Sequence, residues 1–200
     1  LYVAIDKKYV GYVLIADKIK QDSPKTIREL KAMNIKETVM LTGDKKEVGE
    51  YVAKKLNMDK VYTELLPDGK VEKVEELLKQ KSEKGKLVFV GDGINDAPVL
   101  TISDIGVAMG GLGSDAAIEA ADIVIMTDET SKISKAINLS KKTMRIVREN
   151  IIFAIFVKIA VLVLTAFGAS TMWEAVFADV GVSVIAIINA LRMLNIKKFE

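Results

Sequence analysis

The sequence contains the loop Gly91-Asp92-Gly93-Ile94-Asn95-Asp96, which combines two glycines with three side chains that can bind a cation or a hydrogen-bond donor. The apolar run Leu87–Val90 precedes it and predicts a buried β-strand that ends on this loop. In an open parallel sheet, ligands bind at the carboxyl ends of the strands. The two glycines let backbone amides turn toward an anion without a Cβ in the way. The loop therefore predicts an anion-handling site at the edge of an α/β sheet.

Two carboxylates and one amide crowd the end of this predicted strand. Asp92 directly follows the first glycine, where its carboxylate can reach a hard cation such as Mg²⁺. Asn95 and Asp96 begin the following helix, where the first can act as a cap and the second can hold the loop. Folding alone gives little reason to gather these groups, so this loop is the most specific motif in the chain.

Two weaker motifs precede it. Thr42-Gly43-Asp44 follows the predicted strand Thr38–Leu41, and Lys70 lies on the helix after Leu65-Leu66-Pro67. A Thr-Gly-Asp turn or a surface lysine is by itself usually structural or solvated. Their order on successive strand–helix units makes coincidence improbable, and Lys70 can bring a positive charge to phosphoryl oxygens.

Strands and helices alternate around these motifs. A β-hairpin is expected first, from Leu1–Ile5 and Tyr9–Ala16, and then a helix with Ser23 as N-cap and Pro24 at its first position. Further helices are expected at 46–56, 69–84 and 114–120, and further strands at 61–62, 87–90, 105–108 and 123–126. This alternation implies βαβ crossovers and a mainly parallel sheet covered on both faces.

The C-terminal third is strongly apolar. After a long helix that begins near Lys132, Ile151–Ala169 contains one charge, Lys158, and Ala175–Leu191 contains one charge, Asp179. A 19-residue helix is about 28 Å long, close to the thickness of a bilayer's hydrocarbon core. The short connection predicts an antiparallel membrane-spanning pair, and the alternative is a helical hairpin buried in a soluble core.

Basic residues flank both outer ends of this pair. They are Lys141, Lys142, Arg145 and Arg148 before it, and Arg192, Lys197 and Lys198 after it. The excess of positive charge on one side places both ends, and the α/β domain, in the cytoplasm.

Composition excludes several classes of chemistry. The 29 basic and 27 acidic residues give a net charge of +2, which offers no reason to expect nucleic acid as a partner. The chain has no cysteine, so it needs no disulfide. It also has no histidine, which excludes a serine–histidine triad, a histidine base and an imidazole metal site. Carboxylates, lysines, hydroxyls and backbone amides must do the chemistry.

The motif order resembles the phosphorylation domain of P-type ATPases, within the haloacid dehalogenase superfamily. The resemblance extends through Asp92–Leu100 and Gly106–Gly110 to Ser114–Ile125, a stretch typical of heavy-metal pumps. It implies a haloacid-dehalogenase-like Rossmannoid parallel sheet followed by a two-helix transmembrane hairpin. The implied divisions are 1–16 (end of a nucleotide domain), 17–131 (phosphorylation domain), 132–150 (linking helix), 151–194 (two transmembrane helices) and 195–200 (cytoplasmic tail).

The resemblance also implies residue roles. Asp92 and Asp96 are expected to bind Mg²⁺, and Thr42, Gly43 and Lys70 to contact the transferring phosphoryl group. Asp44 and Asn95 complete the expected catalytic set, and Asp17, Lys20, Gly91 and Gly93 are the expected nucleotide or cofactor contacts. ATP and Mg²⁺ are the implied cofactors, and the plasma membrane is the implied location.

The nucleophile of that family is absent. It is the aspartate of an Asp-Lys-Thr-Gly-Thr motif, and the nearest approach, Asp6-Lys7-Lys8, is interpreted as a turn. We therefore expect an upstream polypeptide or a companion chain to carry the nucleophile and six further helices, and this chain alone to be inactive. The alternatives are a non-catalytic membrane-bound remnant, or a membrane-anchored phosphatase, which needs an Asp-x-Asp that is missing near the N-terminus.

Lys158 and Asp179 bear on the transported ion. They form either a structural ion pair, or a carboxylate ligand and a charge partner that replaces the cation after release. A carboxylate suits Zn²⁺ and similar divalent ions better than Cu⁺. The Asp179-Val180-Gly181 segment and Lys158 resemble the corresponding residues of the zinc, cadmium and lead branch of the heavy-metal pumps.

Overall fold

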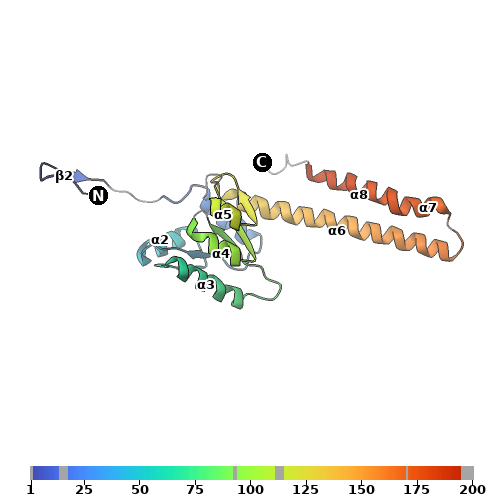
Figure 1. Cartoon of the computed structure of the whole chain (residues 1–200), viewed down its shortest axis with the longest axis horizontal. Helices are drawn as coiled ribbons and strands as arrows, with labels where there is room; N and C mark the ends of the chain where they lie inside the picture. The colour runs from blue at the N-terminus through green and yellow to red at the C-terminus, as the bar shows by residue number, and fades with distance from the viewer. Residues whose placement is uncertain (1, 14–17, 92–93, 111–114, 170, 195–200) are drawn as a thin grey trace. The chain divides into compact units, whose positions relative to one another are not determined.

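The computed structural model describes residues 2–13, 18–91, 94–110, 115–169 and 171–194 (Figure 1). The chain divides into two compact units, Leu1–Ile133 and Ser134–Glu200. These two units do not test the predicted division of the chain into five segments, which stays a prediction.

The chain begins with an antiparallel hairpin. It consists of β1 (Tyr2–Ile5) and β2 (Lys8–Tyr12). Asp6 and Lys7 form the turn between them, with φ angles of 49° and 63°. The predicted hairpin and the interpretation of Asp6 as a turn residue are both confirmed.

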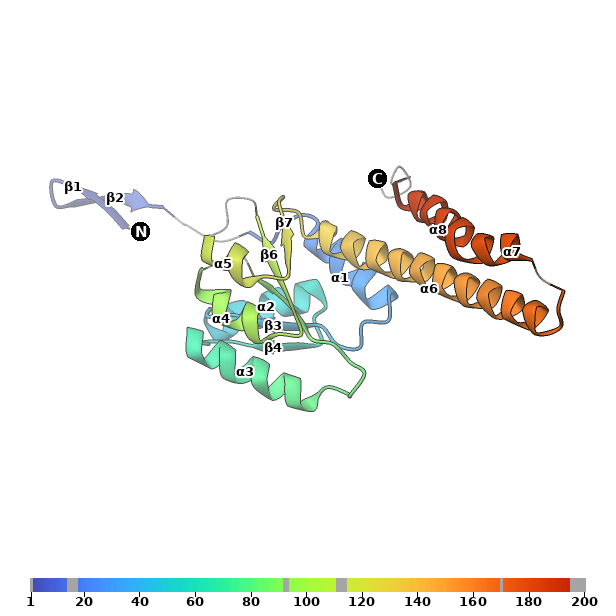
Figure 2. The same cartoon turned by 45° about the vertical axis from the view of Figure 1, so that its right-hand side comes forward.

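Parallel strands alternate with helices in the rest of the first unit. The strands are β3 (Val39–Leu41), β4 (Lys60–Tyr62), β5 (Val88–Gly91), β6 (Ile105–Met109) and β7 (Ile123–Ile125). The helices are α1 (Ser23–Ala32), α2 (Lys46–Leu56), α3 (Pro67–Gln80), α4 (Ala97–Ile102) and α5 (Asp115–Ala120), with a 3₁₀ turn η1 (Ile94–Asp96) before α4. The predicted parallel α/β arrangement is confirmed (Figure 2).

The strands form two ladders rather than one continuous sheet. One contains β3 and β4, and the other has the order β5-β6-β7. Within the described chain, β3 and β5 each pair along one edge only. Val88 and Val90 of β5 are 43% and 37% exposed, whereas parallel strands are normally buried on both faces. Among the residues that the structure describes, one edge of β3 and one edge of β5 therefore have no pairing strand.

The core of this unit lies around β6. Val107 and Met109 of this strand pack with Ile125 of β7. Leu100 of α4 is also fully buried, and α4 contacts β6 closely. Because α4 directly follows the loop that carries the predicted site, this packing holds the C-terminal end of the loop against the core.

Gly106→Ala is expected to destabilise the chain by about 1–3 kcal/mol. A Cβ at Gly106 would lie 2.6 Å from the carbonyl oxygen of Leu100, and a backbone atom cannot move aside as a side chain can. Urea unfolding of the chain in detergent, followed by circular dichroism, measures the loss. Gly11→Ala is the matched control, because no atom lies within 4 Å of its added Cβ. Equal stability of both variants would contradict the packing described here.

The first helix starts one residue earlier than predicted. Ser23 is its first residue rather than its N-cap, and Asp22 takes the cap position without a side-chain cap bond to α1. The Asp22 carboxylate instead accepts a 2.8 Å hydrogen bond from the backbone amide of Ser131. This bond is the largest cause of a lowered pKa for Asp22. Thr26 approaches Thr130 within 3.2 Å, so α1 is tied to the start of the last long helix.

A second carboxylate joins β3 to β4. Asp59 accepts hydrogen bonds from the Thr38 amide at 2.8 Å and its hydroxyl at 2.6 Å, and from Lys31 at 2.7 Å. The hydrogen bond from Lys31 is the largest cause, followed by those from Thr38, of a pKa lowered to about 2 for Asp59.

Asp59→Asn is expected to lower the free energy of unfolding near neutral pH by about 1 kcal/mol. Solvent screening limits the effect because the side chain is 39% exposed. A lowered pKa stabilises the fold above the unfolded value of 3.8, and this gain disappears as the pH falls toward 2. Urea unfolding of parent and variant between pH 6 and pH 2 tests this, with Glu83→Gln as an exposed control. A difference that persists unchanged at pH 2 would contradict the assignment.

The C-terminal part is helical. Its elements are α6 (Ser131–Ala166), α7 (Met172–Val176), a π-helical turn η2 (Phe177–Gly181), α8 (Val182–Ala190) and a 3₁₀ turn η3 (Leu191–Leu194). Helix α6 runs unbroken through the predicted linking helix and the first predicted span (Figure 1). It ends three residues before Ala169, and the second helical stretch begins three residues before Ala175.

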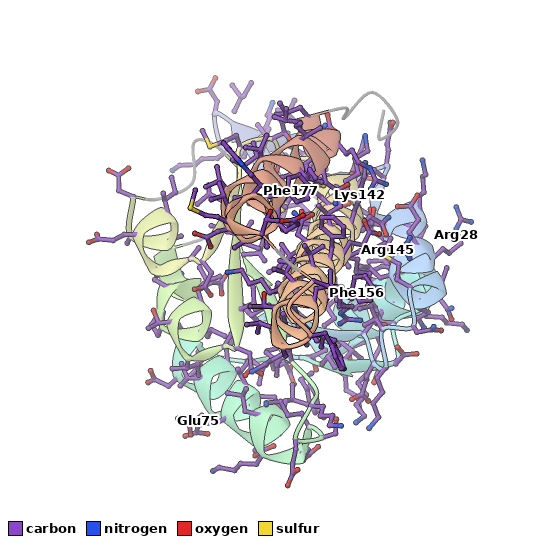
Figure 3. All side chains as sticks on the ribbon, turned by 90° about the vertical axis from the view of Figure 1, so that its right-hand side faces the viewer. Arg28, Glu75, Lys142, Arg145, Phe156 and Phe177 are labelled. Carbon is purple, nitrogen blue, oxygen red and sulfur yellow. The ribbon has the colours of Figure 1, made fainter. Side chains whose placement is uncertain are left out.

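Two helical stretches, Ser131–Ala166 and Met172–Leu194, are long and apolar enough to cross a membrane. Their large apolar side chains are mostly exposed, among them Phe156 and Phe177 (Figure 3). Lys142 and Arg145, also labelled there, lie on α6 before its apolar part and are exposed or half-buried. The predicted apolar hairpin is confirmed as a pair of helices joined by hydrogen bonds.

Candidate functional site: the strand ends and the Lys158–Asp179 pair

The Thr42-Gly43-Asp44 turn closes on itself directly after β3. The Thr42 hydroxyl donates a 2.8 Å hydrogen bond to the Asp44 carboxylate and accepts one of 3.1 Å from the Asp44 amide. The Thr42 amide donates to the carbonyl of Tyr62, and the Leu65 amide donates to the carbonyl of Thr42. The turn is thus held against the end of β4, with its hydroxyl and carboxylate at the carboxyl edge of the strands.

Lys70 and Asp96 form the central contact of the site. The Lys70 ammonium lies 2.8 Å from the Asp96 carboxylate, and their side chains are only 20% and 12% exposed. Lys70 comes from the first turn of α3 and Asp96 from the end of η1, so the pair joins the two predicted motifs. Loss of one partner would leave the other charge unpaired, and this is costly because both groups are largely removed from water.

Gly91 explains how Asp96 reaches this position. A Cβ at Gly91 would lie 2.9 Å from the Asp96 Cβ and 3.0 Å from one of its carboxylate oxygens. Only glycine at the end of β5 leaves room for the carboxylate. The structure therefore gives Gly91 a packing reason for its place in the motif, and its contact with a cofactor stays a prediction.

The rest of the predicted loop is only partly described. Asp92 and Gly93 lie outside the described residues, and Asn95 is exposed in η1. In the described ranges, no three acidic residues gather into a group that could hold a metal ion. Asp96 already bonds to Lys70, so its role as a Mg²⁺ ligand remains a prediction.

Lys20 lies in a different contact. Its ammonium pairs with the Asp128 carboxylate at 2.5 Å, at the connection that leads into α6. Asp17, its predicted companion near the nucleotide, lies outside the described residues. The structure thus brings together Lys70, Asp96 and Gly91, and records a separate partner for Lys20.

Lys158 and Asp179 meet across the two apolar helices. The Lys158 ammonium lies 3.4 Å from the Asp179 carboxylate, and the side chains are 57% and 78% exposed. Asp179 sits in η2, and π-helical turns inside α-helices are frequent at functional sites. The sequence left open whether these two residues touch, and the structure resolves that question.

Comparison with known proteins assigns the chain to a family. The family model described as "haloacid dehalogenase-like hydrolase" matches residues 2–101, half of the chain. The chain belongs to this hydrolase family.

Among the individual proteins that the chain matches are metal-transporting ATPases. The cadmium, zinc and cobalt-transporting ATPase of Bacillus subtilis is 56% identical over 98% of this chain and 28% of its own length. The zinc-transporting ATPase of Synechocystis is 53% identical over 96% of this chain and 27% of its own length. The crystal structure of a zinc-transporting PIB-type ATPase in the E2.Pi state matches with a TM-score of 0.84 and 35% identity, over 96% of this chain and 31% of that one.

These matches confirm the resemblance to heavy-metal P-type ATPases. They also show that the chain spans little more than a quarter of the length of the curated relatives.

Sequence reasoning missed two groups of polar residues. Asp22 accepts a hydrogen bond from the start of α6, 109 residues away in the sequence. No local sequence pattern predicts so distant a partner. Asn150 and Asn189 bond to each other across the apolar helices. Their amide side chains in or beside otherwise apolar segments are the sequence signal that could locate them.

Proposed function

We propose that the chain is the C-terminal part of an ATP-driven exporter of divalent heavy-metal ions such as Zn²⁺, Cd²⁺ or Pb²⁺. The observation that carries this proposal is the Lys158–Asp179 pair on two helices fit to cross a membrane. Charges inside a bilayer are costly and are retained mainly for function. A carboxylate suits these divalent ions, and a neighbouring ammonium can neutralise it when the ion leaves.

The exposure of this pair supports the presence of further helices. Side chains that are 57% and 78% exposed on a two-helix unit would face lipid in isolation. Intramembrane charges almost always face a bundle interior or a water-filled cavity. Six further helices from the remainder of the pump would supply that interior, in a multi-pass protein of the plasma membrane with its α/β unit in the cytoplasm.

The strand ends would handle the phosphoryl group of ATP. Lys70 would neutralise its oxygens, Thr42 and Gly43 would orient it, and Asp96 would hold Lys70 in place. The residues fit Mg²⁺, which takes few protein carboxylates and shares its other positions with phosphate oxygens and water. Asp92 and Asp96 would hold it, and when bound it supplies charge neutralisation at the phosphoryl oxygens.

The nucleophile would come from outside these 200 residues. No Asp-Lys-Thr-Gly-Thr sequence occurs in the chain, and the matched relatives are more than three times longer. The uncovered edges of β3 and β5 suit a parallel strand from the remainder of the pump. A strand there would end beside Thr42 and Lys70. An aspartate at the end of that strand could then receive the phosphoryl group on its side-chain carboxylate.

A chimera tests this proposal. The chain replaces the matching segment of the Bacillus subtilis relative, and membranes are incubated with labelled ATP and Zn²⁺ or Cd²⁺. We expect acid-stable labelling and ion-stimulated ATP hydrolysis in the chimera, and neither in the 200-residue chain alone. Labelling of the isolated chain, or a well-expressed chimera without ion-stimulated turnover, would overturn the proposal.

A further inference from the structure

A polar network joins the two apolar helices away from the charged pair. Asn189 of α8 donates a 2.7 Å hydrogen bond to the side-chain oxygen of Asn150 on α6. The side-chain nitrogen of Asn150 in turn donates a 3.1 Å hydrogen bond to the backbone carbonyl of Ala186. Arg192 donates a 2.8 Å hydrogen bond to the side-chain oxygen of Asn189, and its guanidinium lies 3.2 Å from the Glu149 carboxylate. Both asparagines are half-buried, and each uses its oxygen and its nitrogen within the network.

We propose that Asn150 and Asn189 are positioning residues that set the register of the two helices and so align Asp179 with Lys158. The link to ion transport rests on the proposed function, whereas the register itself is a property of this chain. These asparagines are called the amide clasp below. A single polar pair can specify the register of apolar helices, because any other register leaves its amides unpaired.

The need for such a device follows from helix geometry. Lys158 lies eight residues after Asn150, a rise of about 12 Å in a regular α-helix. Asp179 lies ten residues before Asn189, and the π turn η2 (Phe177–Gly181) overlaps the start of that stretch. The two sides therefore differ in length and in winding between the same two contacts. Regular helix geometry does not by itself bring Asp179 level with Lys158.

The surrounding surface would not select the register. Ile185 and Phe153, the apolar residues that line the hollow beside the clasp, are both exposed and so are not locked into one packing arrangement. Aliphatic side chains pack acceptably in several neighbouring registers, whereas amides require defined partners. A slip of one turn would set Lys158 against Ser183, the residue one turn beyond Asp179.

Cysteine crosslinking of the full chain in membranes measures the register directly, because the natural sequence has no cysteine. The pair Lys158→Cys/Asp179→Cys reports the described register, and Lys158→Cys/Ser183→Cys reports the slipped one. We expect the first pair to crosslink at least five times faster with the clasp intact. In an Asn150→Leu/Asn189→Leu background, the two rates are expected to become similar.

Matched variants separate positioning from folding. Asn138→Leu makes the same change at an exposed position of α6 and is expected to leave the crosslinking ratio unaltered. Asn150→Asp keeps the acceptor for Asn189 but loses the donor to Ala186, and is expected to give a ratio between those of the parent and the double leucine variant. If the double leucine variant fails to accumulate, Asn150→Leu alone is measured against Asn150→Asp. An unaltered ratio in the clasp variants would overturn the proposal, whatever the activity of the chimera.

The chimera provides the functional readout. Clasp variants are expected to raise the Zn²⁺ concentration for half-maximal ATPase stimulation about tenfold, with labelling by ATP at saturating Zn²⁺ within twofold of the parent. Equal losses of labelling and of ion stimulation would indicate a general structural defect and contradict a positioning role. Absence of labelling in the unmodified chimera would instead contradict the proposed function and leave the crosslinking result standing.

Discussion

Lys70→Met in the chimera is expected to lower the rate of phosphoenzyme formation at least 100-fold. Lys70 is held at the strand ends by Asp96 and is only 20% exposed, so its charge acts where water screens it little. Removing one preorganised group that stabilises developing charge typically costs 100- to 1,000-fold in rate. The measurement is single-turnover labelling with ATP at saturating ion concentration.

Two companion variants sharpen this experiment. Lys79→Met removes an exposed lysine from the same helix α3 and is expected to label at the parental rate. Asp96→Asn keeps a hydrogen-bond acceptor for Lys70 but removes the opposite charge, and we expect an intermediate loss. A Lys70→Met chimera that labels as fast as the Lys79 control would remove Lys70 from the site.

Asp179→Ala is expected to abolish Zn²⁺- and Cd²⁺-stimulated turnover in the chimera. The substitution removes the carboxylate and leaves the Lys158 ammonium without its partner at 3.4 Å. If the pair lies in a membrane as proposed, an unpaired charge there also destabilises the fold, so low activity alone would not distinguish a lost ligand from a folding defect. The amount of chimera in the membrane is therefore measured with the ion-stimulated ATPase rate.

A double variant resolves that ambiguity. Lys158→Met/Asp179→Leu removes both charges and replaces them with apolar side chains. We expect it to accumulate at least as well as Asp179→Ala while remaining unstimulated by either ion. Ion stimulation in the double variant would exclude Asp179 as a ligand and return the pair to a purely structural role.

Local sequence signals located most of the fold. Helix α2 was predicted with its observed limits, and all five parallel strands lie within one or two residues of their predicted positions. These elements depend on apolar runs and turn residues that lie within each segment. The start of α1 was misplaced because Ser23 resembles a cap, whereas the preceding Asp22 bonds to Ser131 instead.

The candidate site shows the same division between local and distant information. Lys70 and Asp96 were selected separately, and their contact depends on how α3 and η1 meet. The break between the two ladders could not be predicted, because each strand reads as an ordinary buried segment. The amide clasp was missed because asparagine is common in loops and draws attention only when its partner is known.

The uncovered edges of β3 and β5 have a practical consequence. Unpaired strand edges promote association with other chains, so production of the chain alone should favour aggregation. A separately supplied polypeptide that fills the gap would suppress it, which makes the two pieces suited to fragment complementation. Recovery of folded, non-aggregated chain in detergent would then report assembly of the sheet before any ion or nucleotide is added.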